Sequence, residues 1–214
     1  MSARLERVRR VVGALRAEYA ETPTLLVHRN AFELLISVIL SAQTTDAQVN
    51  SVTGKLFAEF PDARSLAAAE LSRIEAIIHS VGFYRVKARN IRAAAGELEA
   101  RFGGVVPREI EQLITLPGVG RKSANVVVGH IWGEPAIIVD THFMRVTRRL
   151  DLVDATDPTR IEFELKAWVP VEIQYEFSML VNFHGRRYCT ARKPTCADCP
   201  IRAICPWPEK PAGA

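Results

Sequence analysis

The segment LPGVGRKSANVV, residues 116–127, contains a lysine in what should be the first turn of an apolar helix. A buried ammonium there has no evident partner, so Lys122 is the first candidate for a chemical role. The glycines at 118 and 120 let the backbone take positive φ and leave N–H groups directed outward, beside the positive end of the next helix dipole. The pattern predicts a site for a phosphate-sized anion, although an ordinary helix–helix turn would explain Gly118 and Gly120 alone.

The cysteines form a second candidate site. All four follow the pattern C-x6-C-x2-C-x5-C, at Cys189, Cys196, Cys199 and Cys205, and the rest of the chain has none. This clustering favours one local thiol site in a reducing compartment over a disulfide framework. Four thiolates can hold a tetrahedral zinc ion or a 4Fe-4S cluster. Zinc sites usually show two close pairs, and here only Cys196 and Cys199 form one.

The third candidate is a carboxylate. Asp140 stands between the apolar stretch AIIV and the segment THFMRV. We expect it to be a helix N-cap, with Val139 and Met144 as a hydrophobic staple. A capping role is compatible with catalysis, because a cap holds the carboxylate in one place.

Composition sets limits on the elements that position these residues. The chain has 214 residues, is 48% hydrophobic and 24% charged, and can bury one core or a core with a smaller lobe. It contains no run of 18 apolar residues, and its first ten residues lack a secretory signal pattern, so we expect a soluble cytoplasmic protein with no membrane partner. A net charge of +4 permits a nucleic-acid partner without requiring one.

Apolar residues recur at helical spacing almost throughout, which predicts an all-α fold. The segment from Ala136 to Val139 is expected to be an extended linker, and Thr44, Thr45 and Asp46 are possible caps. Helices are expected over 5–19, 32–39, 49–60, 66–81 with Gly82 as C-cap, 91–102 ending at Gly103, 107–114 with Pro107 first, and from about Arg121.

Six segments together resemble the helix-hairpin-helix DNA glycosylases, and within them the endonuclease III family. They occur in the family's order and at close to its spacings through nearly the whole chain. These segments are SAQTTD at 41–46, GFYRVKARNI at 82–91, LPGVGRKSANVV at 116–127, VDTH at 139–142, HGRRYC at 184–189 and the cysteine cluster.

The resemblance implies the catalytic pair. Lys122 matches the lysine that attacks the deoxyribose C1′ carbon, and Asp140 matches the catalytic aspartate that stabilises positive charge on the sugar or assists proton transfer. Free lysine has a pKa of about 10.4, so the site must depress it or supply a base. The helix N-terminus and the adjacent Arg121 both disfavour a cation. Because an amine can form a Schiff base, the lysine predicts a glycosylase that also cuts the strand.

The resemblance also implies contacts with DNA. The enzyme must rotate a nucleotide out of the duplex, and Gln43 and Phe83 match the residues that fill the gap. The family more often has an aliphatic residue at the position of Phe83, which could instead make a hydrophobic contact after Gly82. His142 could line the lesion pocket or support Asp140. The remaining expected contacts are Gly118, Gly120, Arg121, Arg186, Arg192 and Lys193, the last three of which could equally be a solvated basic loop.

By the same resemblance, the cysteines hold a 4Fe-4S cluster that staples a small lobe. We expect two helical lobes with a DNA groove between them and Lys122 and Asp140 on opposite walls. The lobes are a six-helix barrel at 25–132 and a discontinuous iron-sulfur domain at 1–24 and 133–214. The expected protein is a monomer that removes oxidised pyrimidines from damaged double-stranded DNA.

Alternatives remain at this stage. An adenine glycosylase would lack the lysine and carry a further C-terminal domain, and a relative acting on 8-oxoguanine would usually lack the four cysteines. The chain could also be a monofunctional glycosylase, or a binding module whose hairpin only grips phosphate.

Overall fold

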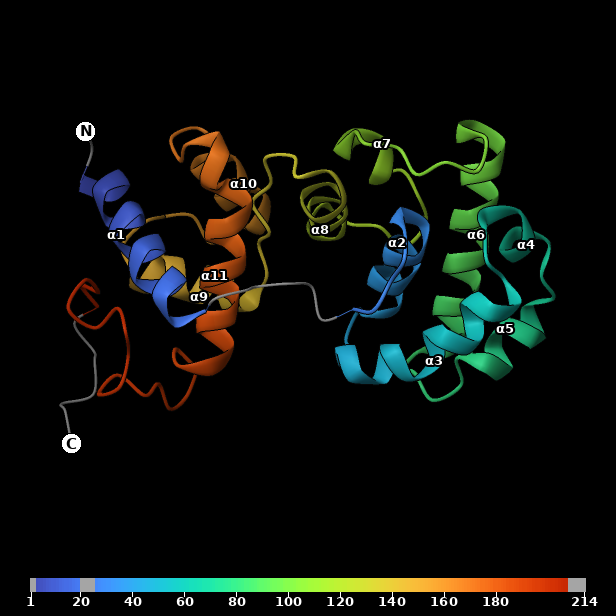
Figure 1. The fold of residues 1–214 in the computed structure, drawn as a ribbon, viewed down its shortest axis with the longest axis horizontal. Helices are drawn as coiled ribbons and strands as arrows, with labels where there is room; N and C mark the ends of the chain where they lie inside the picture. Colours follow the sequence, from blue (N-terminus) through green and yellow to red (C-terminus); the bar gives the residue numbers. More distant parts are fainter. Residues whose placement is uncertain (1–2, 20–25, 208–214) are drawn as a thin grey trace. The chain divides into compact units, whose positions relative to one another are not determined.

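The structure is a computed structural model that describes residues 3–19 and 26–207. Within this part every regular element is a helix, as the sequence predicts (Figure 1). The elements are α1 (Ala3–Glu18), α2 (Ala31–Leu40), α3 (Asp46–Glu59), α4 (Ala63–Ala68), α5 (Leu71–Ile77), α6 (Tyr84–Phe102), α7 (Ile110–Leu113), α8 (Arg121–Trp132), α9 (Thr141–Arg149), α10 (Pro158–Lys166), the short 3-10 helix η1 (Val171–Ile173) and α11 (Gln174–Arg187). None of these helices is long and apolar enough to cross a membrane.

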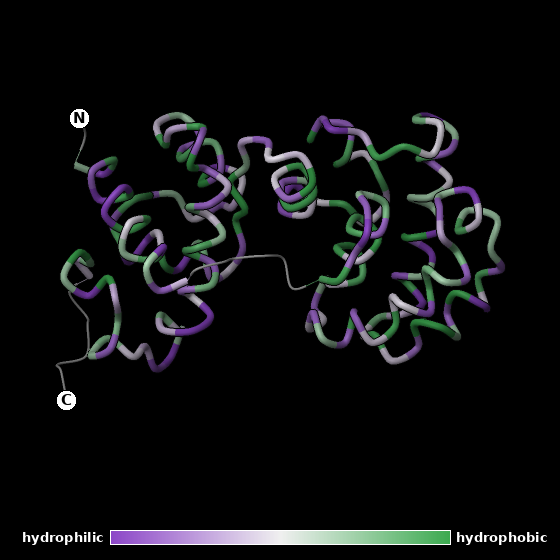
Figure 2. Tube along the Cα trace, in the orientation of Figure 1, coloured by the Kyte–Doolittle hydropathy of each residue, from purple (hydrophilic) through white to green (hydrophobic). Residues whose placement is uncertain are grey.

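The chain divides into two compact units. The hairpin unit is Thr24–Gly133, and the cysteine unit combines Met1–Pro23 with Glu134–Ala214. Most of the helices turn one hydrophobic stripe toward the core of their own unit, and the tube in Figure 2 shows green and purple alternating along them, whereas α2 is buried on all sides from Phe32 to Leu40. The interpretation of the units as a barrel and an iron-sulfur domain stays a prediction.

The hairpin unit differs from expectation in its helix count. Its described residues form seven helices rather than six, because the apolar stretch 66–81 is split into α4 and α5. Ala69 and Glu70 are both extended, with ψ of 144° and 128°. The break lets each short helix bury its own apolar residues, including Leu66 and Ile74, which are fully buried.

Helix boundaries in this unit also differ. The helix before Gly82 ends at Ile77, so Gly82 is not its C-cap. The next helix starts at Tyr84 rather than Ile91, because buried Ala88 extends its apolar stripe toward the N-terminus. Pro107 does not start a helix: it is buried in an irregular segment, and α7 begins only at Ile110. The predicted C-cap at Gly103 is confirmed by its φ of 59°.

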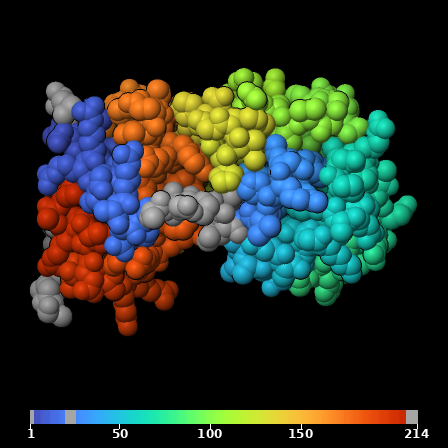
Figure 3. Space-filling view, viewed as in Figure 1, coloured from blue at the N-terminus to red at the C-terminus, as the bar shows by residue number. Residues whose placement is uncertain are grey.

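In the cysteine unit, segments from the two ends of the chain pack against each other. Figure 3 shows its first helix, in blue, against the orange and red of the C-terminal segments, and α1 contacts α11. Val8, Val11 and Leu15 of α1 are fully buried in one core with Phe143 and Phe177. The linker before α9 has no regular secondary structure, and its residues 136–139 are buried.

Candidate functional site

The hairpin turn lies between α7 and α8 and is built around Gly118. Its φ is +81°, and a Cβ there would lie 3.0 Å from Ile39 Cγ2 and 3.1 Å from Asn90 Cβ. Both the backbone conformation and the close approach therefore require glycine. Gly120 does not have positive φ, contrary to expectation: at φ −96° and ψ 173° it is the extended N-cap of α8, a conformation typical of that position.

Lys122 is the second residue of α8 and is exposed, so the expectation of a buried ammonium is wrong. The physical reason is the helix period, because the buried residues Ala124, Val127 and Val128 occupy the other side of the helix. The first N–H groups of a helix have no acceptor within it, and Gly120 has no side chain to offer one. The start of α8 therefore places an exposed amine beside backbone N–H groups of the kind that can bind an anion.

Arg121, expected to contact phosphate, lies near an acidic side chain in this structure. Its guanidinium lies 3.8 Å from Glu111 Oε1, so an acidic side chain partly offsets its charge. Its carbonyl accepts a hydrogen bond of 3.0 Å from Nδ2 of the buried Asn125. The first contact links the first turn of α8 to α7, and the second lies within α8.

Gln43 and Phe83 share a rare backbone conformation. Both have positive φ, 53° and 59°, although neither is glycine. Their side chains are exposed, and that of Phe83 is 67% exposed. The alternative that Phe83 makes a hydrophobic contact after Gly82 is therefore wrong in this structure. Left-handed backbone at non-glycine residues is a strained feature that often marks functional positions.

Asp140 caps α9, as predicted. Its Oδ1 accepts a hydrogen bond of 2.8 Å from the Phe143 N–H. Among the described residues none donates to Oδ2, and the side chain is partly exposed. Val139 is buried in the core against which Met144 packs, in agreement with the expected staple. One carboxylate oxygen is thus fixed by the helix while the other can face a ligand.

His142 and Arg145 connect α9 to the end of α11. Arg145 donates to the Gly185 carbonyl and the Cys189 carbonyl, each at 2.8 Å, and approaches His142 Nδ1 at 3.2 Å. At Gly185 a Cβ would lie 2.9 Å from His142 Cβ, so the two helices touch there. His142 thus helps to position α9, and a place in a lesion pocket stays a prediction.

The sequence reading missed Arg145. The i,i+3 spacing from His142, which places both side chains on one face of a helix, could have revealed it.

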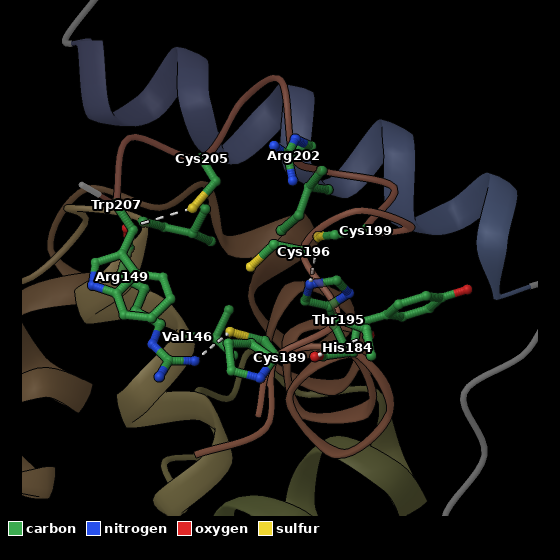
Figure 4. A pocket seen from close by; sticks show the side chains of 14 residues that line it. Val146, Arg149, His184, Cys189, Thr195, Cys196, Cys199, Arg202, Cys205 and Trp207 are labelled. Atoms are coloured by element: carbon green, nitrogen blue, oxygen red, sulfur yellow. Dashed lines mark hydrogen bonds between the residues drawn. The ribbon is translucent and has the colours of Figure 1, made fainter. Parts of the chain in front are cut away.

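The four cysteines, all in the reduced form, line one cavity with about 390 Å³ of empty space, part of it open to solvent. Figure 4 shows their sulfur atoms directed into this shared space. Within the described residues, no three Cys, His, Asp or Glu side chains form a group suited to one metal ion. A zinc ion binds thiolates at about 2.3 Å and would draw the sulfurs together. The arrangement is therefore more open than a mononuclear site.

The surroundings of the thiols are apolar and partly basic. Burial raises the pKa of the Cys199 thiol to about 11, and burial lowers the pKa of His184, 3.5 Å from Cys199 Sγ, to about 4. Arg149 donates to Cys189 Sγ at 3.1 Å and lies over the Trp207 ring. Burial thus disfavours ionisation of the Cys199 thiol, and a bound metal would favour its thiolate.

The predicted basic contacts lie around the same loop. Arg186, in the last turn of α11, and Arg192 and Lys193, between the first two cysteines, are exposed. The loop is held by a hydrogen bond of 2.7 Å from Thr190 Oγ1 to the Lys193 carbonyl. Exposure suits both phosphate binding and simple solvation, so these contacts stay predictions, as does the placement of Lys122 and Asp140 on opposite walls of a DNA groove.

The sequence is similar to those of known proteins over most of its length. The family described as "HhH-GPD superfamily base excision DNA repair protein" matches residues 36–171. Endonuclease III of Synechocystis sp. is 43% identical over 207 residues, 96% of this chain and 94% of that protein. Endonuclease III of Bacillus subtilis is 44% identical over 181 residues, 84% of this chain and 83% of that protein.

Solved structures give the same result. "Structure of a Trapped Endonuclease III-DNA Covalent Intermediate: Estranged-Adenine Complex" matches with a TM-score of 0.89 at 40% identity, over 96% of this chain and 97% of that one. The resemblance inferred from six short segments is thereby confirmed over the whole fold. With its hairpin, its capped aspartate and its four-cysteine cavity, the chain belongs to the HhH-GPD superfamily of base excision DNA repair proteins, in the endonuclease III family.

Proposed function

We propose that this base excision repair glycosylase removes a damaged base by attack of the Lys122 amine on the sugar and then cuts the strand at the abasic site. The observation that carries the proposal is an exposed amine in the first turn of α8, directly after a turn that suits a phosphate. A similar endonuclease III has been captured as a covalent intermediate with DNA, which supports covalent chemistry in this fold.

The reaction follows from the chemistry of a primary amine. The unprotonated Nζ of Lys122 forms a bond to C1′ while the bond from C1′ to the base breaks, and the base leaves with the electron pair. The attached nitrogen then loses one proton, its lone pair forms a double bond to C1′ as the bond from C1′ to O4′ breaks, and O4′ takes up a proton, which leaves a protonated Schiff base. Removal of a proton from C2′ then allows the bond from C3′ to its phosphate oxygen to break. A water or hydroxyl nucleophile could not form this Schiff base, so the lysine accounts for strand cleavage.

Asp140 supplies the negative charge in this proposal. Its Oδ1 is held by the Phe143 N–H at 2.8 Å, and its Oδ2 remains for the substrate. A carboxylate fixed in this way stabilises positive charge that develops on the sugar, or accepts a proton from the attacking amine. Fixing the group before reaction matters because it avoids reorganisation in the transition state.

The cysteine cavity is assigned to a 4Fe-4S cluster. Cys189, Cys196, Cys199 and Cys205 would each bind one iron, which suits thiolates spread around a cavity better than a single ion does. When bound, the cluster supplies four iron–thiolate bonds that tie the irregular segment 189–205 to the end of α11. Its contribution is structural, because the proposed reaction transfers no electrons to or from the protein.

The proposed partner is damaged double-stranded DNA, and the lesions are oxidised pyrimidines. Gln43 and Phe83 fill the gap left by the extruded nucleotide, the first with an amide for base edges and the second with an apolar ring. Gly118, Gly120 and Arg121 bind phosphate at the hairpin. His142 and the basic residues Arg186, Arg192 and Lys193 complete the proposed contacts, and the protein acts as a monomer.

Borohydride trapping tests the proposal. Purified protein is mixed with a duplex that carries one thymine glycol, reduced with borohydride and separated on a denaturing gel. We expect a covalent band with the wild type and none with Lys122→Gln. Lys55→Gln, which alters another exposed lysine of the hairpin unit, is the matched control and should keep the band.

Three results would overturn parts of the proposal. A band that persists in Lys122→Gln would mean that another amine is the nucleophile. No wild-type band on either thymine glycol or a preformed abasic site would reject the lyase activity altogether. Trapping on the abasic site alone would retain the lyase and reject the chosen lesion.

A further inference from the structure

The reaction proposed above does not use Lys87, yet its environment is unusual. The side chain lies in the first turn of α6, is 4% exposed, and donates one hydrogen bond of 2.6 Å, from Nζ to Thr44 Oγ1. Among the described residues no carboxylate forms an ion pair with it. Burial lowers the pKa of Lys87 below its ordinary value. A buried ammonium with one neutral acceptor destabilises a fold, so a role beyond packing is indicated.

The hydrogen bond from Lys87 joins the turn that carries Gln43 to the turn that carries Phe83. Thr44 directly follows Gln43, and a Cβ on Gly82, just before Phe83, would lie 3.8 Å from Thr44 Oγ1. A second hydrogen bond, of 2.8 Å from Gln48 Nε2 to Ser80 Oγ, joins the same two segments further from the tips. The two turns therefore lie side by side and are connected by polar side chains.

Lys87 also holds the second turn through its backbone. Its N–H donates to the Phe83 carbonyl at 3.1 Å, so the same residue contacts one turn by its main chain and the other by its side chain. Gln43 and Phe83 both have left-handed backbone, which non-glycine residues keep only when the surrounding structure enforces it. Lys87 contacts both turns, by its side chain at Thr44 and by the first backbone hydrogen bond of α6 at Phe83.

We propose that Lys87 is a positioning residue, which fixes the Gln43 and Phe83 turns relative to one another so that both side chains enter the duplex together. The proposal rests on the gap-filling role given to these residues under the proposed function. Coordinated entry matters because the extruded nucleotide leaves a single space, and partial filling leaves the neighbouring bases unstacked. The side chain of Lys87 acts through Thr44, so the proposal also requires the threonine hydroxyl as the acceptor of this hydrogen bond.

Three variants test the connection. Lys87→Met keeps the length of the side chain but removes the donor, and Thr44→Val keeps the shape but removes the acceptor. Thr44→Ser keeps the hydroxyl and should behave as the wild type. Lys55→Met, at an exposed position on α3, is the matched control for the lysine substitution.

Opening of the duplex is measured in a protein that cannot carry out the Lys122 reaction. The fluorescence of 2-aminopurine placed beside an abasic site reports the loss of stacking when the protein binds, in a Lys122→Gln background. We expect Lys87→Met and Thr44→Val to reduce the population of opened complex about tenfold, while Thr44→Ser and Lys55→Met leave it unchanged. In proteins that retain Lys122, borohydride trapping on a single-stranded abasic oligonucleotide should stay within about twofold of wild type, because that substrate needs no gap filling.

The outcomes separate this inference from the proposed function. Wild-type fluorescence in a folded Lys87→Met or Thr44→Val protein would overturn the positioning role. A loss of duplex opening in Thr44→Ser, which keeps the hydroxyl, would also overturn it. An equal loss on duplex and single-stranded substrates would also overturn it, because the effect would then be general. Failure of wild-type trapping with normal duplex opening would reject the Lys122 chemistry and leave the positioning role supported.

Discussion

In the hairpin unit the candidate residues stand on tight turns between closely packed helices, whereas in the cysteine unit they stand on segments joined over long sequence separations. Gln43, Phe83 and Gly118 all have positive φ, and they are held by neighbours within the hairpin unit. Asp140 has ordinary extended backbone and is fixed by one capping hydrogen bond. The hairpin unit therefore combines unusual backbone shape with short-range polar contacts such as Lys87–Thr44, and the cysteine unit relies on side-chain connections over long sequence separations.

Polar side chains connect α1 to later segments of the cysteine unit. Arg4 pairs with Asp154 at 2.8 Å, Arg7 donates to the Leu150 carbonyl at 2.7 Å, and Arg16 pairs with Glu176 at 2.5 Å. Exposed ion pairs of this kind contribute only about 0–1 kcal/mol each. The segment after α11 has little regular structure, so the four cysteines must contribute much of what fixes it. The cysteine unit should therefore depend on the proposed cluster, and the hairpin unit should not.

The largest expected effect comes from removing one thiol. Cys196→Ala should abolish the visible absorption of the cluster and destabilise the cysteine unit by at least about 4 kcal/mol, the range typical of a lost metal site. The hairpin unit should keep its stability, because its core contains none of the cluster ligands. Urea unfolding can follow each unit by fluorescence once the tryptophans of the other unit are replaced by phenylalanine, since Trp132 lies in the hairpin unit and Trp168 and Trp207 lie in the cysteine unit.

Ala197→Ser is the matched control for this experiment, because it changes the neighbouring residue without removing a ligand. It should retain both the absorption and the stability. If the Trp132 transition moved together with the other two in Cys196→Ala, the proposed independence of the two units would be wrong.

The second prediction separates the two roles of Asp140. Asparagine caps helices about as well as aspartate, so Asp140→Asn should change stability by less than about 0.5 kcal/mol. It removes the charge, however, and should slow base excision about 10²–10³-fold, the loss typical of a fixed electrostatic group. Asp140→Ala removes both and should also lose about 1 kcal/mol of stability. Single-turnover excision and urea unfolding measure the two effects, and an Asn variant with full activity would leave Asp140 as a cap only.

Much of this architecture can be predicted from the sequence where local rules decide. The helical period located α1, α2 and α3 well, Asp140 reads as a cap, and Gly103 ends α6. The spacing of Cys196 and Cys199 pointed to a thiol site in the right segment. In each case the pattern depends on residues close in sequence, so no tertiary information is needed.

The remaining features depend on tertiary contacts that override local preference. The positive φ of Gln43 and Phe83 contradicts the preference of both residue types, so no sequence pattern indicates it. Lys87 is buried although lysine is usually exposed. The contact of Arg145 with Cys189 spans 44 positions. These departures lie at or beside candidate functional residues, where local and global requirements most often conflict.

The smallest predicted effect tests whether backbone shape fixes the hairpin unit. At Gly118 an added Cβ would meet Ile39 and Asn90 at 3.0–3.1 Å, and φ is +81°. Gly118→Ala should therefore lose about 2 kcal/mol of stability, from left-handed backbone and crowding together. Gly96 lies inside α6 with nothing within 4 Å, so Gly96→Ala should gain about 0.5–1 kcal/mol. Urea unfolding followed by Trp132 should give opposite signs, and a neutral Gly118→Ala would show that the turn adapts and that backbone shape does not hold it.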